Sequence, residues 1–314
     1  MKHKAKYLTI IGGGLWGLSL GNLAKHNQEN TINLWSRNSH ETLELAIIRA
    51  DVIVSAVSMK GVRPTIEKLQ EINISETLII VTATKGLDPE TTHTPSQIWQ
   101  GAFPHNPIVV LSGPNLSKEI QKGLPAATVV SSYNINAAET VQSIFSSDIF
   151  RVYLNNDPIG TELGGTLKNV IAIAAGVCDG LQLGINAKSA LLTRALPEMI
   201  RVGTELGASP ETFFGLSGLG DLMATCDSPL SRNYRVGYGL AQGQKLDQIL
   251  IELGSTAEGV NTTNVLIDLA KKQKIAVPIA RQVYRLLNGK ITPQEAVQSL
   301  MARELKSEFD DLDF

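Results

Sequence analysis

One lysine stands out because it lies in the middle of an apolar segment that reads as a helix. From Leu163 to Cys178, Lys168 is the only charged residue. Burial of an unpaired ammonium is costly, and desolvation lowers the pKa of a lysine from about 10.4 towards neutrality. Such an amine can protonate a carbonyl oxygen during hydride transfer. The alternative is a lysine whose stem carries its ammonium to water at the helix edge; the neighbouring Asn169 favours a lined cleft.

A carboxylate that could accompany this amine ends the glycine-rich sequence GLSGLGD at 215–221. The segment is not a phosphate-binding P-loop, because no Gly-Lys-Ser/Thr follows it. The turn could place Asp221 beside the amine of Lys168. Asp221 could also cap a helix over 222–226, and the two roles are compatible.

Two further segments carry groups suited to an anionic substrate. Ser231, Arg232 and Asn233 open a predicted helix, where a hydroxyl, a guanidinium and free N–H groups suit a phosphate; a plain surface helix start is the alternative. Lys85 follows a predicted strand, at the edge where open α/β sheets bind ligands. We expect Lys85, Lys168 and Arg232 to supply the local positive charge.

A glycine-rich turn predicts a dinucleotide site near the amino terminus. The sequence GGGLWG at 12–17 fits G-x-G-x-x-G, and it lies between a predicted strand and a predicted helix. Gly12 permits the tight turn, Gly14 the approach of a pyrophosphate, and Gly17 the packing of helix on strand. A glycine-rich turn in an unrelated α/β fold is the alternative.

The end of the second predicted strand bears on which cofactor is bound. NAD-selective proteins hold the ribose 2′-hydroxyl with an acidic residue there, but this chain has Ser36 and Arg37 instead. A guanidinium can pair with a 2′-phosphate, so we expect NADP(H), NAD(H) or both to be bound. Arg37 could also be an ordinary solvated charge.

The segments that must position these residues predict two domains in an α/β fold. Continuous apolar runs read as buried strands of a parallel sheet and alternate with helical segments; they lie at 7–11, 31–35, 51–57, 78–83, 108–111 and 126–130. One of these helices is predicted over 115–122, with Asn115 as its N-cap. After about residue 157 only helical patterns remain. We therefore predict a Rossmann-type domain over 1–155 and an all-helical substrate and catalytic domain over 156–314.

Composition excludes several classes of protein. A net charge of −2 argues against nucleic-acid binding, and no apolar run is long enough to cross a bilayer. The two cysteines are far apart, which predicts neither a disulfide framework nor a metal site and suits the cytoplasm. All five histidines lie in the first third of the chain, so an acid or base in the second half is not histidine.

Taken together, these motifs resemble the bacterial-type NAD(P)-dependent glycerol-3-phosphate dehydrogenases, along nearly the whole chain. The matching stretches are GGGLWG at 12–17, TKGL at 84–87, LSGP at 111–114, ELGGTLKNVIA at 162–172, GLGDL at 218–222, SPLSRN at 228–233 and EG at 258–259.

The resemblance implies reversible reduction of dihydroxyacetone phosphate to sn-glycerol 3-phosphate, which leads into glycerophospholipid synthesis, by a homodimer. It implies that Lys168 donates and accepts the proton and that Asp221 is its partner in the site. The implied substrate contacts are Lys85, Gly113, Asn115, Lys168, Asn169, Asp221, Ser231, Arg232 and Asn233. The implied cofactor contacts are Gly12, Gly14, Leu15, Trp16, Gly17, Arg37, Lys85, Ser117, Arg232 and Glu258. No metal is implied.

Three departures from the family pattern bear on these expectations. Members usually carry a few dozen more residues between the arginine of the second strand and the third strand, where this chain has only residues 38–49. That shortening leaves open the preference between NADH and NADPH. Leu15 stands where a small residue is usual, and Asn115 replaces a usual hydroxyl residue.

Two other functions are compatible with part of this pattern. A dehydrogenase of 3-hydroxy acids or sugar acids would also use a Rossmann domain and a catalytic lysine, but the Ser231-Arg232-Asn233 group favours a small phosphorylated ketone. A non-catalytic NADP(H) sensor would fit the shortened segment after Arg37. It would not need the lysine and carboxylate at 168 and 221.

Overall fold

The computed structural model describes residues 6–26, 29–254, 256–305 and 307–308. The chain forms two compact units. The first unit comprises Met1–Lys85 and His93–Glu162, and the second comprises Gly86–Thr92 and Leu163–Phe314.

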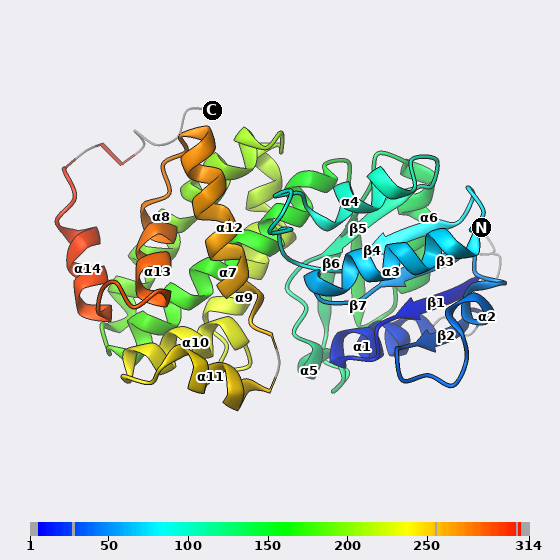
Figure 1. The fold of residues 1–314 in the computed structure, drawn as a ribbon, viewed down its shortest axis with the longest axis horizontal. Helices are drawn as coiled ribbons and strands as arrows, with labels where there is room; N and C mark the ends of the chain where they lie inside the picture. The colour runs from blue at the N-terminus through cyan, green and yellow to red at the C-terminus, as the bar shows by residue number, and fades with distance from the viewer. Residues whose placement is uncertain (1–5, 27–28, 255, 306, 309–314) are drawn as a thin grey trace. The chain divides into compact units, whose positions relative to one another are not determined.

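A seven-stranded sheet forms the centre of the first unit, with the strand order β2-β1-β3-β4-β5-β6-β7 (Figure 1). The strands are β1 (Tyr7–Ile11), β2 (Thr31–Trp35), β3 (Val52–Ser55), β4 (Ile79–Thr82), β5 (Ile108–Ser112), β6 (Ala126–Ser131) and β7 (Phe150–Asn155). The predicted parallel sheet is confirmed for β1 to β5. β6 runs antiparallel to β5, and β7 runs parallel to β6, so the last two strands point the other way.

The seventh strand was not predicted, and its sequence explains why. In β7 the buried Phe150 and Val152 alternate with the exposed Arg151 and Tyr153. This is the period-two pattern of a strand that is covered on one face only. The continuous apolar runs that mark the other strands are absent from it.

Helices cover both faces of this sheet. One face packs against α1 (Leu15–Lys25), α5 (Ser117–Ile120) and α6 (Ile135–Phe145). The other packs against α2 (Leu43–Ile47), α3 (Met59–Ile72) and α4 (Pro95–Ala102). The two-sided burial explains why the central strands read as nearly unbroken apolar runs.

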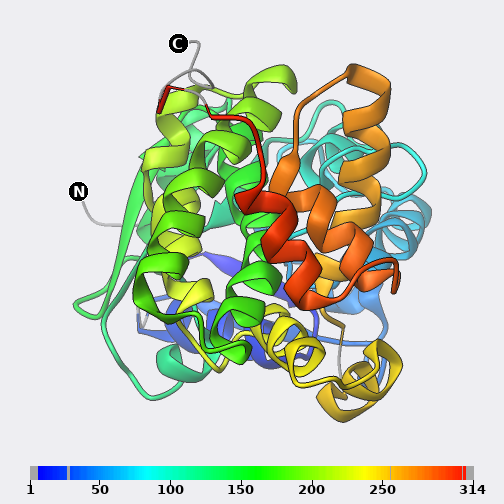
Figure 2. The same ribbon diagram turned by 90° about the vertical axis from the view of Figure 1, so that its left-hand side faces the viewer.

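The second unit is mostly helical, as predicted, and its described residues include no strand. Its helices are α7 (Pro158–Gly180, which begins in the first unit), α8 (Gly184–Glu205), α9 (Asp221–Cys226), α10 (Arg232–Ala241), α11 (Leu246–Leu253), α12 (Glu258–Gln273), α13 (Pro278–Leu287) and α14 (Pro293–Met301). A 3-10 turn (Pro210–Phe214) and a π turn (Leu216–Gly220) precede α9. Figure 2 shows α13 packed between α12 and α14.

Helices α7 and α10 approach so closely that their backbones touch. A Cβ atom added at Gly237 of α10 would overlap the carbonyl oxygen of Ile173, and one added at Gly176 of α7 would overlap the carbonyl oxygen of Tyr234. Glycine is an unfavourable residue within a helix, but only glycine allows this contact. The sequence therefore gives up some helix propensity to bring α10 directly against the helix that carries Lys168.

Two buried glutamates hold the amino-terminal ends of other helices. The Glu162 carboxylate accepts hydrogen bonds from the backbone N–H and the hydroxyl of Ser96 in α4. The Glu198 carboxylate accepts from the backbone N–H groups of Ile279 and Ala280 in α13. Burial raises the pKa of each carboxyl to about 7, although these hydrogen bonds act in the opposite direction.

These raised values predict a stability that falls as the pH rises. Since the folded-state pKa of Glu198 lies above its unfolded value of 4.5, the folded chain binds more protons between pH 4.5 and about 7. The glutamine side chain of Glu198→Gln is neutral at every pH. The free energy of unfolding of the wild type should therefore fall by about 2 kcal/mol relative to that of this variant between pH 5 and 7.5. Urea denaturation at the two pH values measures the difference.

A matched control is Glu295, which also caps a helix but is exposed. A backbone hydrogen bond from Thr292 lowers the pKa of Glu295, so its ionisation lies below this pH window. The stability difference between wild type and Glu295→Gln should therefore be the same at pH 5 and 7.5. An equally constant difference for Glu198→Gln would show that Glu198 is ionised throughout.

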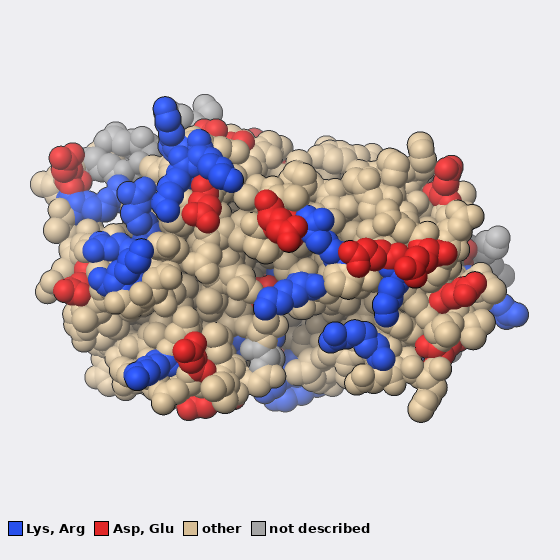
Figure 3. Space-filling model, in the orientation of Figure 1, with Lys and Arg blue, Asp and Glu red and all other residues tan. Residues whose placement is uncertain are grey.

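The surface of the described residues carries both signs of charge. Lysine and arginine side chains lie among acidic ones on the face drawn in Figure 3. Within the described ranges, no helix is both long and apolar enough to cross a membrane.

Candidate active site

The glycine-rich loop joins β1 to α1 in the first unit. Gly12 has φ +131°, and a Cβ there would lie 2.7 Å from the carbonyl oxygen of Ala56. A Cβ at Gly17 would overlap the carbonyl oxygen of Gly12, whereas Gly14 has no atom within 4 Å of its Cβ position. Gly14 is also the N-cap of α1 and supplies no side-chain cap. The open space and the uncapped helix end suit a pyrophosphate.

The two residues after Gly14 differ in their surroundings. Leu15 is exposed, whereas Trp16 is half-buried and its indole N–H donates to the carbonyl oxygen of Ala83 at 3.3 Å. This bond links the first turn of α1 to the end of β4. Any contact of Leu15 with a cofactor through its backbone is indifferent to the size of its side chain.

A tight turn follows β2 at the position that bears on cofactor choice. The backbone N–H of Ser36 donates to the Ser39 hydroxyl at 2.9 Å, and the side chain of Arg37 is exposed. The shortened segment after Arg37 folds as this turn followed by the five-residue helix α2. The exposed guanidinium is thus available to a ligand at the end of the strand.

Lys85 and Gly113 meet at the carboxyl edge of the sheet. The Lys85 ammonium donates to the carbonyl oxygen of Gly113 at 3.3 Å. A Cβ at Gly113 would lie 3.0 Å from the Cα of Thr128 in β6, so this position has little room for a side chain. These two predicted substrate contacts therefore lie at the edge where open α/β sheets bind ligands.

The predicted role of Asn115 as a helix cap is wrong. Helix α5 begins at Ser117 with Leu116 as its N-cap, and no side chain caps it. The Asn115 side chain instead accepts from the Thr128 hydroxyl at 2.8 Å and donates to the carbonyl oxygen of Ala127 at 3.1 Å. The amide thus bonds to the neighbouring strand β6 rather than to the start of the helix. Ser117 is half-buried, and its carbonyl oxygen accepts from Ser19 of α1.

In the second unit, Lys168 forms a buried ion pair with Asp221. The Lys168 Nζ lies 3.0 Å from Asp221 Oδ1, and the two side chains are 7% and 3% exposed. Lys168 therefore does not extend to water at the helix edge, and Asp221 does more than begin α9. Burial disfavours the charged amine while the carboxylate favours it. The ion pair holds the amine in place against α9.

Thr225 belongs to this cluster, although the sequence analysis did not predict it as a site residue. Its hydroxyl oxygen lies 2.5 Å from Lys168 Nζ and donates to Asp221 Oδ1 at 3.1 Å. Residues 221 and 225 are one turn apart on α9, so they share a helix face. That spacing was the signal that could have identified Thr225.

Glycines explain how Asp221 comes so close to α7. A Cβ at Gly164 would lie 2.8 Å from the carbonyl oxygen of Ser217, and one at Gly218 would overlap the backbone of Phe213. The π turn Leu216–Gly220 then leads directly into α9. Single π turns are frequent at functional sites.

A network of amides joins three helices next to Lys168. The Asn233 side chain donates to Asn169 Oδ1 at 2.8 Å and accepts from the backbone N–H of Gly259 at 3.0 Å. A Cβ at Gly259 would lie 2.6 Å from the carbonyl oxygen of Asn169. Asn169, Asn233 and the start of α12, where Glu258 is the first residue, are thus brought together.

The three residues that open α10 have different surroundings. The Ser231 hydroxyl caps the helix by accepting from the backbone N–H of Tyr234 at 3.2 Å. Asn233 is buried in the amide network, and Arg232 is exposed.

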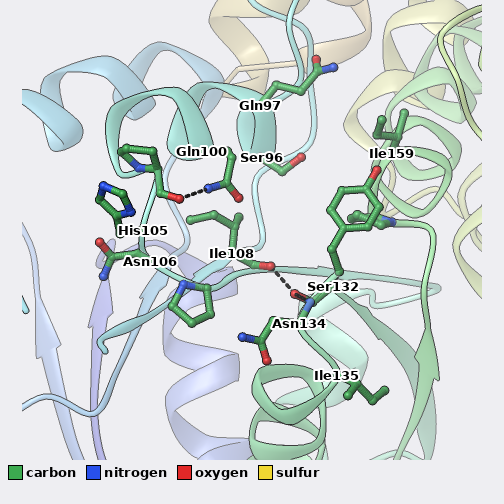
Figure 4. A pocket seen from close by; sticks show the side chains of 14 residues that line it. Ser96, Gln97, Gln100, His105, Asn106, Ile108, Ser132, Asn134, Ile135 and Ile159 are labelled. Carbon is green, nitrogen blue, oxygen red and sulfur yellow. Dashed lines mark hydrogen bonds between the residues drawn. The ribbon is translucent and has the colours of Figure 1, made fainter. Parts of the chain in front are cut away.

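A cavity of about 590 Å³ in the first unit is lined by none of these residues. Fourteen residues line it, among them Ser96, Gln100, Tyr133, Ile159 and Ile108, the first residue of β5 (Figure 4). The residues that line it include no lysine, arginine, aspartate or glutamate. It is therefore a poor site for a phosphorylated ligand. Within the described ranges, no group of three histidine, cysteine or acidic side chains could hold a metal ion.

Comparison with known proteins gives consistent matches. Residues 39–138 and 157–298 match the models of the N-terminus and the C-terminus of NAD-dependent glycerol-3-phosphate dehydrogenase. The chain is 64% identical over 306 residues to a glycerol-3-phosphate dehydrogenase [NAD(P)+] from Synechocystis sp., covering 98% of this chain and 96% of that protein. It is also 64% identical to the protein of that name from Acaryochloris marina, with 97% and 98% covered.

The coverage also shows whether a similar protein carries a longer segment at the place of residues 38–49. Since the aligned residues make up 96% of the Synechocystis protein, several dozen additional residues do not fit there. The short segment is thus shared with similar proteins.

A solved structure agrees with these matches. The crystal structure of glycerol-3-phosphate dehydrogenase from Coxiella burnetii has a TM-score of 0.91 and 31% identity, and 96% of this chain and 100% of that one are covered. On the sequence and the fold together, this chain belongs to the NAD-dependent glycerol-3-phosphate dehydrogenase family.

Proposed function

We propose that this chain catalyses the reversible reduction of dihydroxyacetone phosphate to sn-glycerol 3-phosphate with NADPH or NADH. The observation that supports this most strongly is the buried cluster of Lys168, Asp221 and Thr225, in a chain of this family. In this proposal residues 1–155 bind the dinucleotide, and residues 156–314 carry the acid–base group.

When bound, a nicotinamide would supply or take up the hydride at the carbon that is reduced or oxidised. The remaining step is a proton transfer at the oxygen on that carbon, and Lys168 performs it. In the reducing direction its ammonium donates a proton to the developing alkoxide, and in the oxidising direction its amine accepts the hydroxyl proton. Asp221 and Thr225 hold the Nζ in place and stabilise its charged form.

The phosphate of the substrate would be held at the start of α10. The guanidinium of Arg232 offers paired donors to a phosphate, and the helix end adds its own N–H groups. Because the amides of Asn169 and Asn233 fix this helix start against α7, the phosphate and the reacting oxygen would be held at a set distance.

A direct assay tests the proposal. The purified chain is mixed with dihydroxyacetone phosphate and either NADPH or NADH, and the loss of nicotinamide absorbance is followed. Turnover with at least one cofactor is expected. Absence of turnover with both cofactors would contradict the proposal. If a 3-keto acid is turned over in place of dihydroxyacetone phosphate, and dihydroxyacetone phosphate is not, a related dehydrogenase is favoured.

Arg37 is expected to serve NADPH in particular. Removal of one charge-assisted hydrogen bond costs about 1.5–3 kcal/mol, so Arg37→Ala should raise the KM for NADPH by about tenfold or more. The KM for NADH should change less than about twofold, because NADH lacks the 2′-phosphate. Initial rates with each cofactor provide both values.

The control for this variant is Arg281→Ala, which removes an exposed arginine from α13 in the second unit. It should leave both KM values unchanged. Equal increases for NADPH and NADH in Arg37→Ala would mean that Arg37 supports the strand end without reading the 2′-phosphate.

We further propose that the chain acts in the cytoplasm as a homodimer. The family resemblance supports this assembly, and the cysteine usage supports a reducing compartment. Sedimentation equilibrium tests the assembly, since a single species of monomer mass would contradict it.

A further inference from the structure

A second charged cluster lies in the second unit, and the acid–base chemistry does not use it directly. The Lys188 ammonium of α8 lies 2.7 Å from Asp179 Oδ2 and 2.9 Å from Asp227 Oδ1. It also lies 5.6 Å from the centre of the Tyr234 ring, whose hydroxyl donates to Asp179 Oδ2 at 2.7 Å. One lysine, whose side chain is 12% exposed, thus contacts residues from three other segments of the chain.

The two aspartates stand at places where a negative charge is unfavourable. Asp179 is the penultimate residue of α7, and Asp227 is the C-cap of α9. Helix dipoles are negative at their carboxyl ends, so each aspartate is repelled by the end of its own helix and by the other aspartate. A cation between them removes both costs.

The protonation of the cluster follows from its contacts. Burial alone would lower the pKa of Lys188, but the hydrogen bonds to Asp179 and Asp227 and their charges raise it above its ordinary value. Burial, together with the bond to Asp179, raises the pKa of Tyr234 to about 12, so its phenol remains a donor. The cluster therefore keeps its charge-assisted bonds near neutral pH, with Asp227, whose side chain is 86% exposed, as its outer member.

The helices that this cluster joins are those that carry the proposed active site. Helix α7 carries Lys168, and α9 carries Asp221 and Thr225. Tyr234 directly follows Asn233 in the first turn of α10, and Asp227 begins the loop that leads to Ser231. Lys188 therefore ties together the far ends of the two helices whose near parts form the ion pair, and it also fixes the loop before the phosphate-binding helix start.

We propose that Lys188 is a positioning residue for the reaction, which sets the placement of Asp221 and Thr225 against Lys168 and of the start of α10. The proposal rests on the function proposed above. It concerns geometry, so Lys188 itself neither contacts the substrate nor transfers a proton.

The test is Lys188→Met, which keeps the length of the side chain and removes its charge. Small displacements of catalytic groups cost up to about a hundredfold in rate, so kcat/KM for dihydroxyacetone phosphate should fall by about tenfold or more. We expect both a lower kcat and a higher KM, because the ion pair and the phosphate site shift together. The dissociation constant of NADPH, measured by quenching of protein fluorescence, should change less than about twofold.

Two companion variants make the result specific. Lys188→Arg keeps the charge and should recover most of the lost kcat/KM. Lys271→Met is a matched control, because Lys271 also contacts an aspartate, Asp268 at 3.7 Å, and a tyrosine ring, that of Tyr284 at 5.8 Å, but its side chain is 65% exposed. It should leave all kinetic constants unchanged.

The outcomes separate this inference from the proposed function. No turnover by wild type contradicts the proposed function itself. If wild type is active and Lys188→Met lowers the melting temperature while kcat/KM at 25 °C stays within about twofold, Lys188 is only structural and the inference is overturned. If Lys188→Arg is as impaired as Lys188→Met in a chain that is folded by circular dichroism, a positioning role through charge is likewise overturned.

Discussion

Replacement of Lys168 by alanine should lower kcat for dihydroxyacetone phosphate by about a thousandfold or more. A positioned acid or base contributes about 10²–10⁴ to the rate, and removal of this amine also takes the lysine partner from the Asp221 carboxylate. The affinity for NADPH should not change, because Lys168 is not among the residues that the family resemblance implies as cofactor contacts. Steady-state kinetics and fluorescence titration with NADPH measure the two quantities.

A second variant separates catalysis from folding in this experiment. Breaking a buried ion pair by removing one partner costs about 3–5 kcal/mol, so Lys168→Ala alone could unfold. Lys168→Met combined with Asp221→Asn removes both charges and fills the space, and it should regain stability without regaining turnover. A double variant that is stable and retains more than about a tenth of wild-type kcat would show that Lys168 is not the acid–base group.

The second large effect is expected from Gly237→Ala in α10. The added methyl group would overlap the carbonyl oxygen of Ile173, which is part of the backbone and cannot rotate away. Overpacking costs about 1–3 kcal/mol or more, and here α10 must move away from α7. We expect a loss of about 3 kcal/mol in the free energy of unfolding, together with a loss of turnover. Urea denaturation measures the first and the absorbance assay the second.

Gly101→Ala is the matched control for this substitution. Gly101 also lies within a helix, α4, but no atom lies within 4 Å of its Cβ position. There the methyl group meets only open space, and the better helix propensity of alanine should stabilise the chain by about 0.5–1 kcal/mol. A gain in stability from Gly237→Ala as well would mean that α7 and α10 are not packed backbone to backbone.

The parts of the fold that could be predicted from the sequence are those with a strong local pattern. The central strands β1, β3, β4 and β5 contribute buried residues to the cores on both faces of the sheet and read as continuous apolar runs, whereas the edge strand β2 is partly exposed. Buried and exposed side chains alternate along the edge strand β7, which was not predicted. The reversed direction of β6 depends on which strand it pairs with, and no local pattern records that.

In the candidate site, too, the residues with a conspicuous local sequence pattern were predicted and those without one were not. Lys168 was identified because one charge among apolar residues is conspicuous, and a carboxylate partner at Asp221 was proposed from the glycine-rich turn. Thr225 was missed because a threonine on a short helix is unremarkable until the structure places its hydroxyl at the amine. Asn115 was assigned to a helix cap because the strand that it bonds lies later in the chain.

The two buried carboxyls at Glu162 and Glu198 make folding itself a reaction that consumes protons. At pH 6 each is mostly protonated in the folded chain, where its pKa is about 7, and mostly ionised in the unfolded chain. Unfolding then releases close to two protons to the buffer. The heat absorbed in a calorimeter must therefore include the heat of ionisation of whatever buffer takes them up.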